Sequence, residues 1–331
     1  MEYGYSVPVQ ALDDLILKSS VTTSKSRKQR LYITSWIEKS FTRSYLPLVF
    51  KIFPRHIHVL CIRNSYYWSI KSRDELKKVP NNLKNLNSFV LGWFSFAINR
   101  LILMRACHVV VESAAQRDYL ESLWMARRSK FLVFPGRLAD LRPKVLPPAD
   151  FSLPLKNTLT IGFLGSLNDK RRDLPLVDEF LINLLQRRLS IKIIWLGACL
   201  EPTIVKHLQL LHPEIVFVFP QSGTWTESEF LNYSNHCDYL ISPLKSDWGY
   251  HLGMSTGSLA DAIFLKRKVF YPGYVDFGKA AENFCFFYDS AHDLVEKVVN
   301  FWSNEEKKHV IDSVYLQPFL LSTFQSKISE C

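Results

Sequence analysis

Two short segments of the chain carry residue types that suit the binding of a phosphorylated ligand. Residues 253–263, GMSTGSLADAI, combine glycines and hydroxyl residues with an acid, and residues 165–173, GSLNDKRRD, combine a glycine with three consecutive basic residues. Unpaired amides at the start of a helix bind anions, and Lys and Arg side chains bind phosphate. Each segment alone also fits a capped surface helix or an exposed turn, so the surrounding fold decides between the two interpretations.

The first segment predicts a helix that begins at its hydroxyl residues, where amides and hydroxyls together make room for a phosphate. One turn into that helix stands Asp261, whose carboxylate is able to reach the diol of a ribose. The residues expected around the phosphate are Ser255, Thr256, Gly257 and Ser258.

The second segment supplies positive charge. Gly165 permits close approach of the backbone, and Arg171 and Arg172 are expected to project from the loop toward a diphosphate. Ser166 and Lys170 complete this predicted site.

A parallel sheet with helices on both faces is the predicted frame for these segments. Beyond residue 158, short apolar runs alternate with helix-like segments, the pattern of a doubly wound α/β domain. A helix is predicted over 173–189, and the spacing of Thr226 and Glu229 has the form of a capping box. Ligands bind beyond the carboxyl ends of parallel strands, where both segments fall. The predicted strands are residues 159–164, 191–196, 215–219, 238–242, 268–271 and 284–288.

The first half of the chain predicts a second, more irregular α/β domain. Its strand-like runs are residues 30–37, 56–62, 107–111 and 130–134, with long helical stretches between the second and the third. Four prolines between residues 136 and 155 mark a linker. The predicted divisions are an amino-terminal domain over 1–140, a linker over 141–155, a second domain over 156–303, and a terminal helix and tail over 304–331.

Charge is unevenly divided between the two halves. Residues 1–150 hold 24 Lys and Arg against 11 Asp and Glu, a net of +13, whereas residues 151–331 hold 17 against 20, a net of −3. The basic half predicts an anionic partner such as a membrane surface, although a solvated face that only keeps the protein soluble fits as well. The apolar stretch 88–104 is short for a bilayer span and contains Asn99 and Arg100, so we predict peripheral attachment.

Cysteine and histidine usage favours neither disulfides nor a metal site. The six cysteines have no paired spacing, and most lie in or beside apolar runs, as buried thiols do. Together with an amino terminus that lacks the pattern of a secretory signal, they predict the cytoplasm, with attachment at the inner membrane face. His56 and His58 would share one face of a strand, but no third ligand accompanies them, so neither metal nor cofactor is expected.

Taken together, these features resemble a two-domain glycosyltransferase of the GT-B fold, in which two Rossmann-like domains face each other. IGFLGSLNDKRRDLPLVDEF (161–180) is similar to that family's first donor-domain strand, basic loop and helix, and STGSLADAIFLKRKVFYP (255–272) to its donor-binding helix and following strand. CHVVVESAAQRDYL (107–120) resembles a late amino-terminal strand and helix, and TWTESEFLNYSNHCDYLISP (224–243) the elements beside the nucleotide base. The resemblance covers residues 107–303 and is loose before them.

The resemblance implies an enzyme that transfers a sugar from a nucleotide-diphosphate donor to a glycan or lipid-linked acceptor, in polysaccharide or glycoconjugate synthesis. No cofactor is implied, because the basic residues neutralise the phosphates. Pro220 and Trp225 become further donor-binding residues, while Asp261 and Arg172 gain catalytic roles beside the leaving diphosphate. Many retaining members carry a glutamate eight positions before the residue that Asp261 matches, and here that position is Gly253.

The missing acid leaves the stereochemistry open. Its role either passes to Asp247 or His251, near the donor sugar, or is absent. An inverting reaction needs a general base from the acceptor side, for which the candidates are Glu112, Asp118, His56 and His58.

Two other functions are compatible with parts of the sequence. The missing glutamate leaves room for a non-catalytic scaffold of the same fold that docks on a membrane or protein partner. The basic, aromatic stretch 65–73 suggests nucleic-acid binding. We disfavour a nucleic acid as partner because the basic residues are dispersed and the second domain would then have no role.

Overall fold

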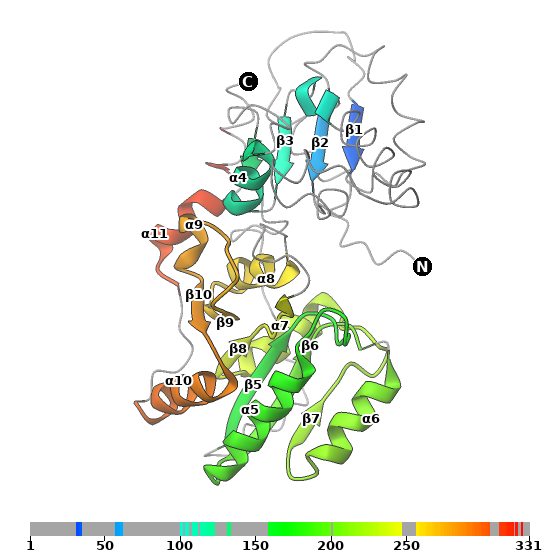
Figure 1. Ribbon diagram of the computed structural model, residues 1–331, viewed down its shortest axis with the longest axis vertical. Helices are drawn as coiled ribbons and strands as arrows, with labels where there is room; N and C mark the ends of the chain where they lie inside the picture. The colour runs from blue at the N-terminus through cyan, green and yellow to red at the C-terminus, as the bar shows by residue number, and fades with distance from the viewer. Residues whose placement is uncertain are drawn as a thin grey trace, which may run out of the picture.

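Two parallel β-sheets with their helices make up the computed structural model (Figure 1). Every pairing between neighbouring strands of the two sheets is parallel. The structure describes residues 31–34, 57–61, 100–101, 103–105, 108–111, 113–122, 131–133, 158–199, 201–246, 256–304, 311–320, 322–323 and 326.

The strands lie on the apolar runs that the sequence marks, so the α/β prediction is confirmed. The first sheet has the order β1-β2-β3-β4, and the second has the order β10-β9-β8-β5-β6-β7. The first sheet consists of β1 (Leu31–Thr34), β2 (Ile57–Cys61), β3 (His108–Val111) and β4 (Phe131–Val133). The second consists of β5 (Thr158–Leu164), β6 (Ser190–Leu196), β7 (Val216–Val218), β8 (Tyr239–Ile241), β9 (Val269–Pro272) and β10 (Cys285–Tyr288).

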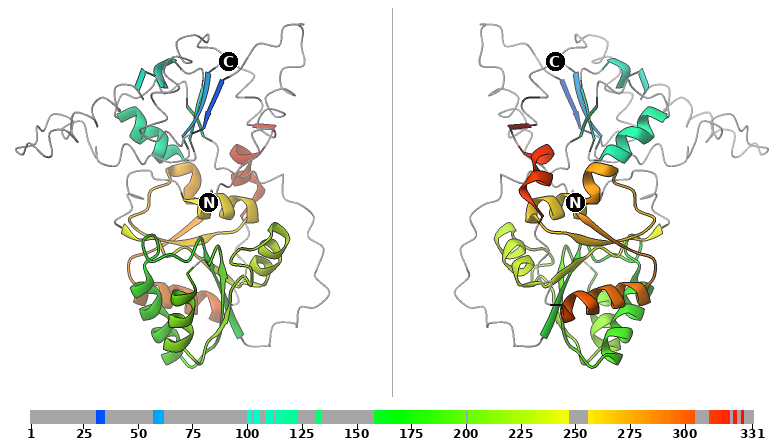
Figure 2. Two further views of the ribbon diagram at one scale, coloured as in Figure 1. Left: turned by 90° about the vertical axis from the view of Figure 1, so that its right-hand side faces the viewer. Right: turned by 90° about the vertical axis from the view of Figure 1, so that its left-hand side faces the viewer.

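Helices cover both faces of the six-stranded sheet, as a doubly wound fold requires (Figure 2). One face packs on α5 (Leu174–Gln186), α6 (Pro202–Leu211) and α10 (Ala291–Ser303). The other packs on α7 (Glu227–His236), α8 (Gly257–Leu265), α9 (Lys279–Glu282), α11 (Ser313–Leu316) and the 3-10 turn Gln317–Phe319. The four-stranded sheet carries α4 (Ala114–Ser122).

Capping residues fix where the helices of the second sheet begin. Asp173 caps α5 by accepting a hydrogen bond from the amide of Leu176 at 3.1 Å. Thr226 and Glu229 form the predicted capping box at the start of α7. Thr256 caps α8, whose other end closes on Lys266 in the left-handed conformation.

The order of the six strands creates one switch point at the carboxyl edge of the sheet. From β5 the chain proceeds outward through β6 and β7, then returns to place β8 on the other side of β5 and continues to β9 and β10. The loops that follow β5 and β8 therefore diverge side by side, which is where ligands bind in open parallel sheets. The two predicted ligand-binding segments follow these two strands.

The two sheets meet through α4 and the turn before α9. Gly278 has a φ of +78°, and a Cβ added there would lie 2.8 Å from Cβ of Ala114. Only a glycine satisfies both the left-handed backbone and this close approach. The predicted linker and the proposed domain boundaries at 140 and 156 lie outside the described residues. So does most of the stretch between β2 and β3, of which residues 100–101 and 103–105 are described and are helical.

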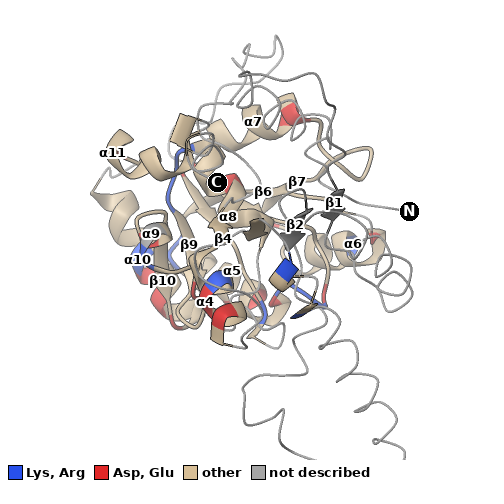
Figure 3. Ribbon diagram, turned by 90° about the horizontal axis from the view of Figure 1, so that it is seen from above, with Lys and Arg blue, Asp and Glu red and all other residues tan. Residues whose placement is uncertain are grey.

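Few of the basic residues that give the first half its charge are described. They are Arg100, Arg105 and Arg117, and on α4 Arg117 pairs with Asp118 at 2.8 Å, so both signs appear together there (Figure 3). The membrane-surface prediction therefore stays a prediction. Among the described residues, the helices are all too short or too polar to cross a bilayer.

Candidate functional site

The loops after β5 and β8 are tied to each other across the switch point. Arg172 and Leu244 form an antiparallel bridge. On either side of it, the amide of Lys245 donates to the carbonyl of Arg171, and the amide of Asp173 donates to the carbonyl of Pro243, each at 3.0 Å. Backbone hydrogen bonds thus join the two predicted ligand-binding loops into one unit.

Arg172 is buried, which corrects the expectation that it projects from the loop. Its side chain is 5% exposed, and its Nε donates to the carbonyl of Ser166 at 3.2 Å. The physical reason is Gly165, whose φ is +95° and whose absent side chain leaves space for the guanidinium. A Cβ at Gly165 would lie 1.8 Å from Nη2 of Arg172.

Lys170 and Arg171 occupy the turn between Asn168 and the bridge. The side chain of Asn168 accepts from the amide of Lys170 at 2.9 Å, and its carbonyl accepts from the amide of Arg171 at 3.2 Å. Lys170 is exposed and Arg171 is half-buried. Of the three basic residues in this loop, these two reach solvent at the carboxyl edge of the sheet.

The start of α8 is lined by hydroxyls that bond to one another. Ser242, which follows β8, donates to the hydroxyl of Ser258 at 2.9 Å, and that hydroxyl lies 3.0 Å from Oγ1 of Thr256. Ser258 is 1% exposed and Thr256 is 7% exposed. Gly257 between them is exposed, with nothing within 4 Å of an added Cβ. The hydroxyl groups therefore hold the helix against β8, whereas the backbone at Gly257 opens outward.

Asp261 lies on the buried side of α8 and is 6% exposed. Burial raises the pKa of the nearby Tyr271 phenol well above its usual range, the Asp261 carboxylate adds to this, and Ser258 and Arg172 act in the opposite direction. Asp261 and Arg172 thus lie around one buried phenol, from α8 and from the β5 loop. The predicted contact of Asp261 with a ribose stays a prediction.

Trp225, a predicted donor-binding residue, is connected to the β5 loop through Trp195. Nε1 of Trp225 donates to the carbonyl of Trp195 at 2.8 Å, and Nε1 of Trp195 donates to the carbonyl of Gly165 at 2.7 Å. Trp225 is half-buried against Tyr233, with ring centroids 4.3 Å apart. Pro220 is buried near the end of β7. These contacts place Trp225 beside the end of β6, next to the switch point.

Of the remaining predicted residues, only Asp118 has a described side chain. Asp118 is exposed on α4 and paired with Arg117. The placement of Glu112, Ser255, Asp247, His251 and His56 lies outside the described residues, and only the backbone of His58 is described, in β2. Within the described ranges, no cluster of three acids, histidines or cysteines has the geometry of a metal site.

The sequence did not reveal one cavity of about 300 Å³ at the ends of β9 and β10. Tyr274, Tyr288 and Asp289 line it together with Asp173. The available signal was Asp289, an acid directly after the predicted strand 284–288, and an acid at this position is also common in plain turns.

Comparison with known proteins identifies the fold. No known protein family matches the chain, and no curated protein matches it by sequence. Sucrose-phosphate synthase from Thermosynechococcus elongatus has a TM-score of 0.55 at 12% identity, covering 90% of this chain and 71% of that one. The pneumococcal O-GlcNAc transferase GtfA, in complex with UDP and GlcNAc, has a TM-score of 0.55 at 11% identity, covering 90% and 56%. α,α-Trehalose 6-phosphate synthase from Burkholderia multivorans has a TM-score of 0.52 at 11% identity, covering 92% and 72%.

The chain has the GT-B fold. Its two parallel-sheet units superpose with these glycosyltransferases over nine-tenths of its length, as the sequence predicts. At such low sequence identity, the structural similarity shows the fold of the chain but not the reaction that it catalyses.

Proposed function

We propose that the protein is a glycosyltransferase that moves a sugar from a nucleotide-diphosphate donor to a glycan or lipid-linked acceptor. The observation that carries the proposal is the bridge between Arg172 and Leu244, which joins the basic β5 loop to the β8 loop at the switch point. A donor would lie in the crevice at this edge, where such sheets bind nucleotides.

The electrostatics of the crevice suit a diphosphate. Lys170 and Arg171 bring positive charge from the β5 loop, and α8 presents its amino-terminal end at Gly257 from the other side. When the bond to the sugar breaks, negative charge grows on the leaving diphosphate. These groups would stabilise that charge in place, with no resident metal ion or cofactor.

Base and ribose contacts are proposed for one residue beside the end of β6 and for one in the middle of α8. Trp225 offers a half-buried ring beside the end of β6, and Asp261 offers a carboxylate on α8. The fold of GtfA, whose structure contains UDP and GlcNAc, supports this class of donor.

The acceptor is proposed to approach the basic first half, at an anionic membrane surface on the cytoplasmic side. The net charge of +13 over residues 1–150 supports this arrangement. Vesicles with anionic lipid should bind the protein at low salt and release it at high salt, and neutral vesicles should not bind it.

Nucleotide binding separates an enzyme from a non-catalytic scaffold of the same fold. In a thermal-shift and calorimetry series with UDP, GDP, ADP and their sugars, the correct nucleotide at 100 times its Kd stabilises the protein by about 2.7 kcal/mol. The same donor incubated with the protein should release its nucleoside diphosphate by transfer or slow hydrolysis. No response to any nucleotide would contradict the proposal and favour the scaffold.

Substitutions in the β5 loop locate the binding site. Lys170→Ala and Arg171→Ala should each weaken nucleoside-diphosphate binding by roughly tenfold to a hundredfold, the effect of one lost charge-assisted phosphate contact. The matched control is Lys206→Ala, which removes an exposed lysine from α6. Equal affinity in all three variants would place the phosphates elsewhere.

A further inference from the structure

A cavity of about 300 Å³ lies at the carboxyl ends of β9 and β10, over the first turn of α5. Leu176 and Pro272 give it an apolar side. None of its lining residues is among the predicted donor-binding residues. The volume is at the lower end of the range for small-molecule sites, sufficient for one sugar ring.

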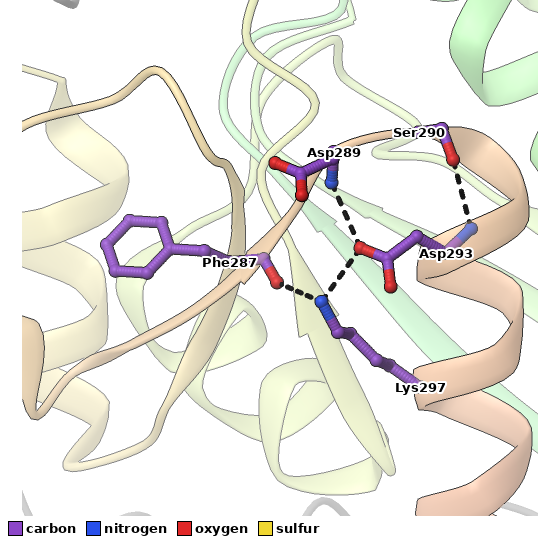
Figure 4. Close-up of polar contacts among 5 residues, drawn as sticks. All are labelled: Phe287, Asp289, Ser290, Asp293 and Lys297. Carbon is purple, nitrogen blue, oxygen red and sulfur yellow. Dashed lines mark hydrogen bonds and ion pairs between the residues drawn. The ribbon is translucent and has the colours of Figure 1, made fainter.

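Asp289 is held at the rim of this cavity by its own backbone. Its amide donates to Oδ2 of Asp293 at 3.0 Å, and Lys297 holds the same oxygen at 2.7 Å and the carbonyl of Phe287 at 2.8 Å (Figure 4). The Asp289 carboxylate points away from this network (Figure 4). It lies against Gly273, where an added Cβ would come within 2.5 Å of Oδ1.

Two tyrosines line the cavity, the buried Tyr288 and the exposed Tyr274. Tyr288 is 1% exposed, and its hydroxyl has no hydrogen-bond partner among the described residues. Buried phenols almost always have a partner, so this hydroxyl calls for a polar atom that the described chain does not supply. Tyr274 lies near it, and its hydroxyl donates to the carbonyl of Leu244 in the β8 loop.

The carboxylates of the cavity retain capacity to accept hydrogen bonds. Asp173 uses Oδ1 to cap α5, and its other oxygen accepts from no described residue. The Asp289 carboxylate likewise accepts from none of the described residues. Carboxylates are acceptors only, so a matching ligand must donate hydrogen bonds.

The negative charge of the two carboxylates limits which hydrogen-bonding ligands the cavity can bind. Two carboxylates repel phosphates and other anions. Calcium takes at least six oxygen ligands, and the part of the chain that the structure describes has no group of three acids, histidines or cysteines that could hold a metal ion. Burial raises the pKa of the Tyr288 phenol, and the positive charge of Arg172 acts in the opposite direction. A neutral molecule with several hydroxyl groups satisfies all of these conditions.

We infer that this cavity binds an uncharged sugar residue of a glycan, separately from the nucleotide crevice. Hydroxyls of the sugar would donate to Asp173 and Asp289, and the Tyr288 hydroxyl would gain its missing partner. The inference goes beyond sugar transfer, since binding here requires neither a donor nor a reaction.

The test uses the full chain with excess UDP, so that the crevice is occupied if it binds UDP. Saturation-transfer NMR and calorimetry are applied to methyl glycosides of glucose, galactose, mannose and N-acetylglucosamine. At least one should bind. Asp289→Ala, an exposed position, should weaken that binding about tenfold or more, and Tyr288→Phe about fivefold.

Matched controls make the result specific. Tyr271→Phe removes the same buried hydroxyl from the neighbouring strand, on the opposite face of the sheet, and Glu282→Ala removes an exposed acid. Both should bind the glycoside as the original chain does. No binding of any glycoside, equal binding in all variants, or binding of calcium or spermidine in place of sugars would each overturn the inference.

Discussion

The guanidinium of Arg172 occupies the space that the absent side chain of Gly165 leaves at the end of β5. A Cβ at residue 165 would lie 1.8 Å from Nη2 and 2.6 Å from Cζ of Arg172. The backbone of Arg172 meanwhile bridges to Leu244. A residue that the sequence suggests as a surface phosphate ligand is therefore buried and supports the loop that follows β5.

Arg172→Ala should lower the free energy of unfolding by about 2–3 kcal/mol, because it removes a buried charged donor and empties the space over Gly165. Arg172→Lys should restore little, since an ammonium cannot reproduce the planar guanidinium. Urea denaturation measures both, with Lys206→Ala as the control for an exposed basic residue. Normal stability combined with weak nucleotide binding would return Arg172 to the role of a direct ligand.

Gly165→Ala should destabilise the protein by more than about 2 kcal/mol, because the new methyl group meets Arg172 and the φ of +95° is strained for alanine. Gly257→Ala is the matched control, since nothing lies within 4 Å of an added Cβ there. It should be neutral or raise stability by about 0.5–1 kcal/mol through helix propensity. Thermal unfolding of the two variants compares them, and equal melting temperatures would refute the steric account.

Tyr288→Phe should leave the free energy of unfolding unchanged or raise it. In the unliganded protein the Tyr288 hydroxyl makes no hydrogen bond to any described residue, so its removal breaks none. Tyr274→Phe should instead cost about 1 kcal/mol, the net value of its hydrogen bond to Leu244. Chemical denaturation of both variants without sugar is the measurement. A large loss in Tyr288→Phe would mean that the native chain itself satisfies this hydroxyl.

Asp293→Asn should reduce stability at pH 7 by about 0.5 kcal/mol, since its partly exposed pair with Lys297 is screened by water. Burial raises the pKa of Asp293, but the Lys297 and Asp289 hydrogen bonds outweigh it and lower the pKa below 3.8. The stabilisation is therefore present above the unfolded value of 3.8 and is lost as pH falls through the folded value. Denaturation at several pH values should show the two proteins converging in acid, and a constant difference down to pH 2 would contradict the ion pair.

The pattern of apolar residues and the helix-capping residues made the six-stranded sheet predictable from the sequence. Its strands are continuous apolar runs because both faces of the sheet are buried. Thr226 and Glu229 mark the start of α7, because their side chains form a capping box with the local backbone. Such signals depend only on neighbouring residues. The meeting of the β5 and β8 loops followed from the same pattern, because parallel strands place all their carboxyl ends at one edge.

Side-chain direction was not predictable at the same positions. Arg172 reads as the third residue of a basic turn, and its burial depends on Gly165, seven residues earlier, and on Leu244 in another loop. The cavity at Tyr288 likewise needs β9, β10 and α5 to be placed together in space. Contacts between distant segments leave no periodic trace in the sequence.

The contact between Gly278 and Ala114 has a consequence for the spacing of the two halves of the molecule. The methyl group of Ala114 on α4 lies so close to the backbone of Gly278 that no room is left for a side chain in the turn before α9. A larger residue at 278 would meet α4 and push it away from the six-stranded sheet. The size of one side chain therefore sets the distance between the two sheets at this contact.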